Sequence, residues 1–193
     1  PLKGDLILYD ELCHASIRDG IQLSNAKAYK FGHNDFEDLE RLIKRSQTEL
    51  GVVYIVTESI FSMDGDAPNL ENLVQLSNTY NCYLVVDEAH ALGVFGDKGE
   101  GLIQYLDLQE HFFARIMTFG KGLGCHGAAI LGSQELIAYL VNFARSFIYT
   151  TGLSPHSVAT ILMAYQDLEK DQAAILKLRE NIVWFNQEKK MLY

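Results

Sequence analysis

The chain has 193 residues, of which 48% are hydrophobic and 21% are charged, and its formal net charge is −9. This balance is typical of a globular domain with a full core and excludes a disordered chain. Because phosphate contacts require clustered Lys and Arg, an acidic chain without a basic stripe argues against a nucleic-acid-binding protein.

Short apolar runs alternate with longer amphipathic ones along the chain. In chain order, the pattern predicts a strand over residues 5–9, a helix over 15–23, a strand over 28–31, a helix that Asn34 caps, a strand over 52–57, a helix that begins at Asn69 and a strand over 82–86. It then predicts strands over 115–119 and 128–131, a helical stretch over 133–147 and a long helix from 154 onward, where Pro155 suits a first helical position. Glu37 is expected to complete a capping box with Asn34.

Strands that are apolar on both faces and separated by helices indicate a parallel sheet that is covered on both sides. We therefore expect an α/β fold, arranged as a three-layer α/β/α domain with a mostly parallel sheet. Residues 1–153 would form the sheet domain, and residues 154–193 would form a long helix leading toward a further, smaller domain. In such sheets ligands bind beyond the carboxyl ends of the strands, so the polar residues there are the functional candidates.

The strand over 82–86 runs into the sequence DEAH at residues 87–90, which permits two interpretations. A helicase-type ATPase can carry DEAH as its second nucleotide motif, but it also needs an earlier GxxxxGK[ST] phosphate loop, which the sequence lacks. A pyridoxal-phosphate enzyme needs an Asp, and often a His, at such a strand end to hold the cofactor ring. Neighbouring strand ends supply His14, Ser62 and Lys121, which favours the second interpretation.

The pyridoxal-phosphate interpretation gives each of these strand-end residues a chemical role. Lys121, set between two glycines, would bind the cofactor covalently through its amine and would also serve as a base. Asp87 would pair with the pyridine nitrogen, and His90 would reach the phenolic oxygen of the ring. His14 would lie flat against the ring, and Thr118 would offer its hydroxyl to the phosphate. Taken singly, such a lysine is more often a loop residue and such a histidine a structural one, so the joint occurrence carries the hypothesis.

Six stretches of the sequence resemble the α-oxoamine synthases, a branch of the fold-type-I pyridoxal-phosphate enzymes. They are DELCHASIRDGIQLS, KFGHNDFEDLERLI, VTESIFSMDGDAPNL, YLVVDEAHALGVFGDKGEG, MTFGKGLGCHGAAILGS and FARSFIYTTGLSP. They span nearly the whole chain in the family's order. The resemblance implies that pyridoxal 5'-phosphate is the cofactor and that the chain is the central part of the large, cofactor-binding domain of a longer subunit.

The resemblance implies the same roles for the five residues above and adds four further candidates. Ser62, in the sequence SMDGD, matches a hydroxyl that approaches the phenolic oxygen of the ring. Thr150 or Thr151 matches a residue that the partner subunit lends to the phosphate, because the family's active site lies at the interface of a homodimer. Glu58 matches an acid that lines the site.

The resemblance also implies an activity, the condensation of an amino acid with an acyl-CoA thioester with loss of coenzyme A and carbon dioxide. HGAAILGS and FARSFIYTTGLSP are most similar to the branch that joins L-alanine to pimeloyl-CoA in biotin biosynthesis. The branches that make 2-amino-3-ketobutyrate, 5-aminolevulinate or 3-ketosphinganine remain alternatives, as does a folded fragment that is inactive on its own.

The cysteines and the chain ends complete the sequence expectations. Cys13, Cys82 and Cys125 are far apart and form no CxxC pair, so neither a disulfide framework nor a zinc site is predicted. A reducing cytoplasm is the expected compartment, with no membrane partner, because no apolar run is long enough to span a bilayer. The chain starts without methionine and ends within a helical pattern, which indicates a piece of a longer protein.

Overall fold

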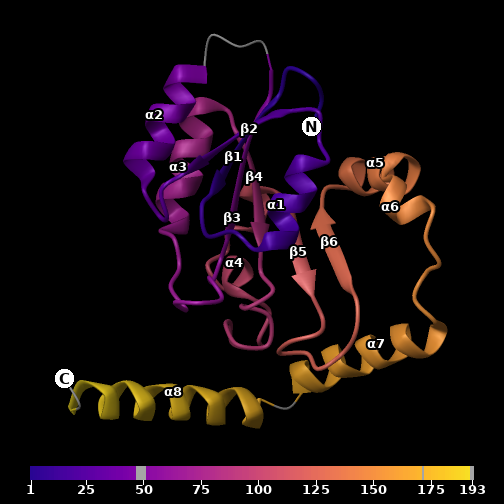
Figure 1. Ribbon diagram of the computed structural model, residues 1–193. Helices are drawn as coiled ribbons and strands as arrows, with labels where there is room; N and C mark the ends of the chain where they lie inside the picture. Colours follow the sequence, from indigo (N-terminus) through magenta and orange to yellow (C-terminus); the bar gives the residue numbers. More distant parts are fainter. Residues whose placement is uncertain (47–50, 171, 192–193) are drawn as a thin grey trace.

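The computed structural model of the chain describes residues 1–46, 51–170 and 172–191 (Figure 1). Six strands form one sheet in the order β2-β1-β3-β4-β5-β6. The strands are β1 Leu6–Asp10, β2 Lys27–Phe31, β3 Val53–Glu58, β4 Tyr83–Asp87, β5 Phe112–Thr118 and β6 Ala128–Gly132. Strands β1 to β5 are parallel, and β6 is antiparallel to β5. The predicted α/β fold with a mostly parallel sheet is confirmed.

One face of the sheet is covered by α2 (Phe36–Ser46) and α3 (Leu70–Tyr80), which lie side by side in Figure 1. Their apolar faces pack against the strands and form the largest core cluster, in which Leu8, Leu39 and Ile55 have no exposed surface. Burial of each such side chain stabilises the fold by about 1.5–3 kcal/mol. This layer therefore holds the sheet rigid beneath the strand ends.

The opposite face carries α1 (Ala15–Gln22) and is covered less completely. Ile7 alternates with its neighbours on β1 and faces α1, where it lines a groove of about 410 Å³ together with Ile17 and Ile21. Farther along this face Tyr83 is 46% exposed. The third layer that the sequence predicts is therefore only partly present in the described residues.

The remaining elements connect and follow the sheet. They are α4 Leu102–Tyr105, the 3-10 helix η1 Gln109–His111, α5 Gln134–Phe143, α6 Arg145–Ile148, α7 Pro155–Lys170 and α8 Ala173–Met191. The stretch predicted as one helix over 133–147 is divided, because the extended backbone of Ala144 (ψ 98°) ends α5. The long helix expected from residue 154 onward is likewise two helices, α7 and α8. No described helix is both long and apolar enough to cross a membrane.

The start of α2 differs from the predicted capping box by one residue. The Asp35 carboxylate accepts a hydrogen bond from the Asp38 backbone N–H at 2.9 Å, so Asp35 rather than Asn34 caps the helix. The acid three residues on is Asp38 rather than Glu37, and its carboxylate accepts from the Gly32 N–H at 3.0 Å. Asn34 instead adopts a left-handed backbone (φ 53°), which an asparagine tolerates well.

Candidate cofactor site

Two buried acids stand side by side where β3 and β4 end. Glu58 and Asp87 are paired in the sheet register and are 3% and 8% exposed. The Ala89 N–H donates to Asp87 Oδ1 at 2.8 Å, and the Ser59 N–H donates to the Asp87 carbonyl oxygen at 2.9 Å. These contacts fix the position of Asp87. They leave its second carboxylate oxygen without a hydrogen bond to the described residues, as a partner for a cationic ring nitrogen requires.

The environment of Glu58 is short of positive charge. Burial raises the pKa of Glu58 to about 6, and the negative charges of Asp87 and Asp10 add to the effect. The backbone N–H of His14, which donates to Glu58 Oε1 at 2.6 Å, and the cationic Lys121 act in the opposite direction. Two buried carboxylates at one strand edge therefore favour the binding of a positively charged group.

His14 caps the first turn of α1 and stays open to solvent. Its Nδ1 accepts from the Ser16 backbone N–H at 3.2 Å and lies 2.8 Å from Ser16 Oγ. These bonds and the backbone bond to Glu58 orient the imidazole at the carboxyl end of β1. A ring held in this way can stack on a flat ligand, because one of its edges is anchored and its side chain is exposed.

His90 lies in the turn after β4, close to both Lys121 and Asp87. Burial lowers the pKa of His90, the positive charge of Lys121 lowers it further, and the negative charge of Asp87 opposes this shift. The lowered pKa favours the neutral imidazole, which can share a hydrogen bond with a ligand oxygen. Lys121, Asp87 and His90 therefore lie close enough for their charges to act on one another.

The loop that carries Lys121 rests closely on the turn after His90. A Cβ on Gly122 would lie 2.4 Å from the Leu92 carbonyl oxygen, and one on Gly93 would lie 3.0 Å from the Gly122 carbonyl carbon. Only glycine permits this approach at Gly122, and Gly93 has in addition a φ of +80°. The glycine beside Lys121 therefore sets the distance between the lysine loop and the DEAH turn, and it leaves the amine exposed.

Thr118 ends β5 and supplies a hydroxyl without a partner. Its Oγ1 is buried and makes no hydrogen bond to the described residues. Thr118 and Asp87 both line the groove beside α1. A buried hydroxyl without a partner, a carboxylate and an exposed lysine amine match the phosphate, ring nitrogen and aldehyde of pyridoxal phosphate, so the residues present fit that group.

Among the described residues, three of the predicted ones share no hydrogen bond with this group. Ser62 is exposed on the turn between β3 and α3. Thr150 and Thr151 are exposed on the segment between α6 and α7, which bows away from the sheet (Figure 1). No hydrogen bond within the described residues joins these hydroxyls to the site, and their roles remain predictions.

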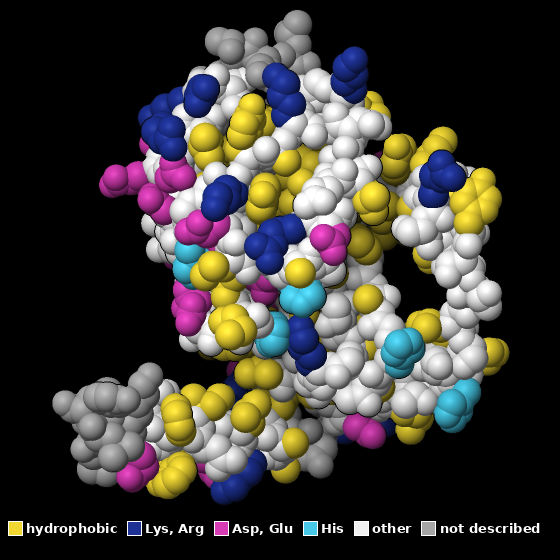
Figure 2. Space-filling view, viewed as in Figure 1, with side chains coloured by type: hydrophobic (Ala, Val, Ile, Leu, Met, Phe, Trp, Pro, Cys, Tyr) yellow, Lys and Arg dark blue, Asp and Glu magenta, His cyan; other side chains and the backbone are white. Residues whose placement is uncertain are grey.

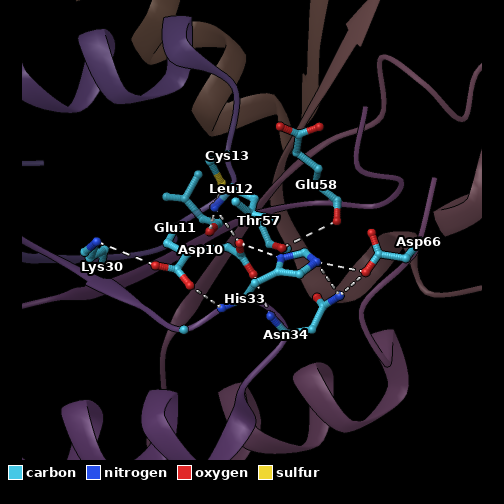
Figure 3. Close-up of polar contacts among 12 residues, drawn as sticks. Asp10, Glu11, Leu12, Cys13, Lys30, His33, Asn34, Thr57, Glu58 and Asp66 are labelled. Carbon is cyan, nitrogen blue, oxygen red and sulfur yellow. Dashed lines mark hydrogen bonds and ion pairs between the residues drawn. The ribbon is translucent and has the colours of Figure 1, made fainter. Parts of the chain in front are cut away.

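Two buried polar groups near the site did not follow from the sequence. Glu88 is fully buried, and its Oε2 accepts two hydrogen bonds from the Arg115 guanidinium, at 2.8 Å from Nε and 2.5 Å from Nη2. His33 lies between the carboxylates of Asp10 and Asp66 (Figure 3). For His33, the one signal in the sequence was the polar stretch GHND directly after a short strand. That stretch favoured a helix cap instead.

Comparison with known proteins identifies the family of the chain. The model of the family "Aminotransferase class I and II" matches residues 2–184. The 8-amino-7-oxononanoate synthase of Thermoanaerobacter pseudethanolicus (strain ATCC 33223 / 39E) is 39% identical over 190 residues, which are 98% of this chain and 48% of that protein. The structure of 8-amino-7-oxononanoate synthase from Francisella tularensis has a TM-score of 0.85 at 32% identity and covers 98% of this chain and 54% of that one. A structure of SPT, serine palmitoyltransferase, with its pyridoxal phosphate has a TM-score of 0.87 at 30% identity, covering 93% of this chain and 45% of that one.

The chain therefore belongs to the aminotransferase class I and II family, and within it to the α-oxoamine synthases. This is a family of pyridoxal-phosphate-dependent enzymes, so the predicted cofactor is confirmed and the ATPase interpretation falls away. The chain spans about half the length of the curated relatives that it matches.

Proposed function

We propose that the chain is the central part of the cofactor-binding domain of an 8-amino-7-oxononanoate synthase, which joins L-alanine to pimeloyl-CoA and releases coenzyme A and carbon dioxide. The observation that supports this most is the convergence of Lys121, Asp87, His90, Glu58 and His14 at the carboxyl ends of neighbouring strands. The names of the relatives support the particular substrates.

Five side chains would hold the cofactor. Lys121 would bind it covalently, and Asp87 would hold a proton on the ring nitrogen with its free carboxylate oxygen. His90, whose pKa is lowered by burial, would donate a hydrogen bond to the phenolic oxygen. His14 would cover one ring face, and the buried Thr118 hydroxyl would donate to the phosphate. When bound, pyridoxal phosphate supplies an electron sink for the negative charge that forms at the substrate α-carbon.

The same residues would then handle the protons of the reaction. The Lys121 amine, freed by the incoming amino acid, would take the α-proton and later return a proton to the new α-carbon. Asp87 would keep the ring nitrogen protonated throughout, since a buried carboxylate next to a cation stabilises the charged pair. The flanking glycines would allow the lysine side chain to move between these positions.

The partners belong to the same proposal. We expect a homodimer with shared active sites, in which Thr150 or Thr151 of one subunit reaches the phosphate bound by the other. That expectation fits the exposure of both threonines in the single chain. The three free cysteines fit a reducing cytoplasm as the compartment.

Covalent trapping tests the cofactor site directly. The chain is mixed with pyridoxal phosphate and reduced with borohydride, and its peptides are mapped by mass spectrometry. We expect one adduct on Lys121 and its loss in Lys121→Arg. Lys98→Arg is the matched control, because Lys98 is also in a glycine-containing loop but pairs with Glu169 at 3.1 Å, and it should leave the adduct intact. An adduct elsewhere in folded protein, with Lys121 unmodified, would contradict the proposal.

Release of coenzyme A tests the substrates. The full-length protein is assayed with pimeloyl, acetyl, succinyl and palmitoyl thioesters against alanine, glycine and serine. We expect the highest kcat/KM for pimeloyl-CoA with L-alanine. A preference for another pair would keep the α-oxoamine synthase assignment and overturn the biotin branch. An adduct on Lys121 without turnover by the 193-residue chain would support the inactive fragment.

A further inference from the structure

His33 is held between two carboxylates from distant parts of the chain. Its Nδ1 lies 2.9 Å from Asp10 Oδ1, and its Nε2 lies 2.8 Å from Asp66 Oδ2 (Figure 3). Asp10 ends β1 and has no exposed surface, whereas Asp66 ends the turn that follows β3, defined here as residues 59–66. One imidazole thus joins two segments that are 56 residues apart, as the numbers of Asp10 and Asp66 show.

The geometry favours a proton on each ring nitrogen. Asp10 is an acceptor, because its carboxylate already takes backbone N–H bonds from Leu12 and Asn34, both at 2.9 Å. Asp66 Oδ2 is an acceptor too, because the Asn34 side-chain amide donates to it at 2.7 Å. The Asn34 side-chain nitrogen also lies 3.2 Å from His33 Nε2, but its shorter contact is the bond to Asp66 Oδ2. A carboxylate oxygen within 2.9 Å of each ring nitrogen favours a ring that donates from both, as the imidazolium does.

The charges around the ring support the imidazolium. Burial opposes protonation of His33, but the hydrogen bonds to Asp10 and Asp66 outweigh it and raise the His33 pKa. Other charged residues lie near His33, and some of them form ion pairs with each other. The charged groups nearest to His33 include Asp10 at the end of β1, Glu11 after it, and Asp66 on the turn. Lys30 on β2 lies 3.6 Å from Glu11, and Asp38 on α2 pairs with Arg41.

The same ring also packs on the base of the turn. The Phe61 ring meets His33 edge-on, with centroids 4.5 Å apart. Within the turn, the Phe61 N–H donates to the Asp66 carbonyl oxygen at 2.9 Å, and the Gly65 N–H donates to the Phe61 carbonyl oxygen at 3.0 Å. His33 therefore contacts both ends of the loop that carries Ser62.

We propose that His33 is a positioning residue that fixes the 59–66 turn, and with it Ser62, by bridging Asp10 and Asp66 as an imidazolium. The role of Ser62 in this statement rests on the proposed function, whereas the bridge itself does not. The bridge makes the turn dependent on pH. It is complete below the pKa of free histidine, and it is lost as the pH rises through the raised pKa of His33.

Amide hydrogen exchange tests the bridge without cofactor. Peptides covering residues 60–67 are followed from pH 6 to pH 9.5 and corrected for intrinsic exchange. In the wild type, protection should fall about tenfold across this range. In Asp66→Asn the dependence should vanish, because a neutral ring can donate to Asp10 and accept from the new amide. His111→Gln, on an exposed histidine, is the control. Protection that does not change with pH in the wild type would overturn the bridge.

A double-mutant cycle tests the link to Ser62. The dissociation constant of pyridoxal phosphate is measured by its absorbance for wild type, Ser62→Ala, His33→Gln and the double variant. If His33 acts through Ser62, His33→Gln should weaken binding about three- to tenfold, and Ser62→Ala should add little in its presence. If the fold-changes in the dissociation constant caused by the two substitutions simply multiply in the double variant, the link is refuted. If Lys121→Arg abolished binding while the cycle was additive, the proposed function would stand and only this inference would fail.

Discussion

The sheet region (residues 1–132) and the C-terminal helices (residues 133–191) differ sharply in what they bury. Nearly all buried hydrophobic residues lie in the sheet region, and Ile175 is the one exception among the described residues. The C-terminal helices expose large apolar side chains along most of their length, as Figure 2 shows for α7 and α8. The residues concerned include Tyr139, Val141, Phe143, Phe147, Leu162, Met163, Val183, Trp184 and Phe185.

The difference shows that an apolar helical pattern in the sequence predicts a helix but does not predict that the helix is buried. The apolar periodicity predicts helices in both regions, and helices form in both. Helices α2 and α3 bury a full apolar face against the sheet. Helix α7 buries only part of one, where Ile161, Ala164 and Leu168 pack on a smaller cluster formed by Leu92, Met117, Phe119 and Leu123. The strand-end residues of the cofactor site belong to the region with the larger core, while its lysine loop also packs on α7 through Phe119 and Leu123.

The largest predicted difference comes from the same substitution made in each region. Leu8→Ala removes a fully buried side chain from β1 and should lower the free energy of unfolding by about 2–5 kcal/mol. Leu162→Ala removes one that is 57% exposed on α7 and should cost less than about 1 kcal/mol. Urea denaturation measures both, with equal m-values as the check on two-state behaviour. Comparable losses from the two variants would break the comparison.

A second prediction concerns the contact that shapes the site. Gly122→Ala places a Cβ against the Leu92 carbonyl oxygen, which must move, so we expect a loss of about 1–3 kcal/mol and at least tenfold weaker cofactor binding. Gly120→Ala is the matched control on the other side of Lys121. Its Cβ would lie 3.7 Å from the Cys125 carbonyl oxygen, an ordinary contact. Cofactor titration and denaturation should therefore separate the two variants, and equal behaviour would show that the close approach is unimportant.

A third prediction uses the pKa of Glu58. Because burial raises this pKa to about 6, folded Glu58 binds a proton more readily than unfolded Glu58 between about pH 4.5 and pH 6. Stability contributed by this group therefore falls as the pH rises through that window. Glu58→Gln keeps an oxygen to accept the His14 N–H but carries no charge. Without cofactor it should be more stable than wild type by on the order of 1–2 kcal/mol at pH 8 and equal to it near pH 4.

The control for this pH series is Glu110→Gln, on an exposed acid of η1. It should follow the wild type at every pH. A Glu58→Gln variant that is less stable than wild type at pH 8 would mean that the carboxylate makes a favourable interaction that outweighs its desolvation.

The sequence predicts the sheet and much of the site because both follow from local patterns. Apolar strands on a parallel sheet end at one edge, so the residues that follow Tyr9, Thr57, Val86 and Met117 had to come together. The convergence of Lys121 with Asp87 and His90 follows once their strands, β4 and β5, are neighbours. The order of the strands and the exposure of the second face of the sheet could not be predicted from the sequence, because they depend on which surfaces pack together in the folded chain.

The bridges that support the site were not predictable for the same reason. His33 pairs with Asp10 and Asp66, and Arg115 pairs with Glu88. These partners are far apart in the sequence, and no periodic pattern connects them. Asn34 was predicted as a helix cap from its residue type. Its side-chain amide instead donates a hydrogen bond to Asp66 in the turn, because a contact made by the tertiary fold outweighs a local preference.

The smallest predicted effects come from the two helix caps, and they refine the comparison between the regions. Asp35 caps α2, whose Leu39, Leu42 and Ile43 are buried, so the helix cannot fray without disturbing the core. Asp35→Ala should therefore lower the global free energy of unfolding by about 1 kcal/mol.

Ser133 makes the equivalent bond in α5, where the Leu136 N–H donates to its Oγ at 3.2 Å. No residue of α5 is buried, so loss of this cap should loosen that helix locally and change global unfolding by less than about 0.3 kcal/mol. Denaturation together with hydrogen exchange of residues 134–143 distinguishes the two cases. If Ser133→Ala lowered the global free energy of unfolding as much as Asp35→Ala, α5 would have to be part of the cooperative core. The boundary between the sheet region and the C-terminal helices would then lie after α5 rather than before it.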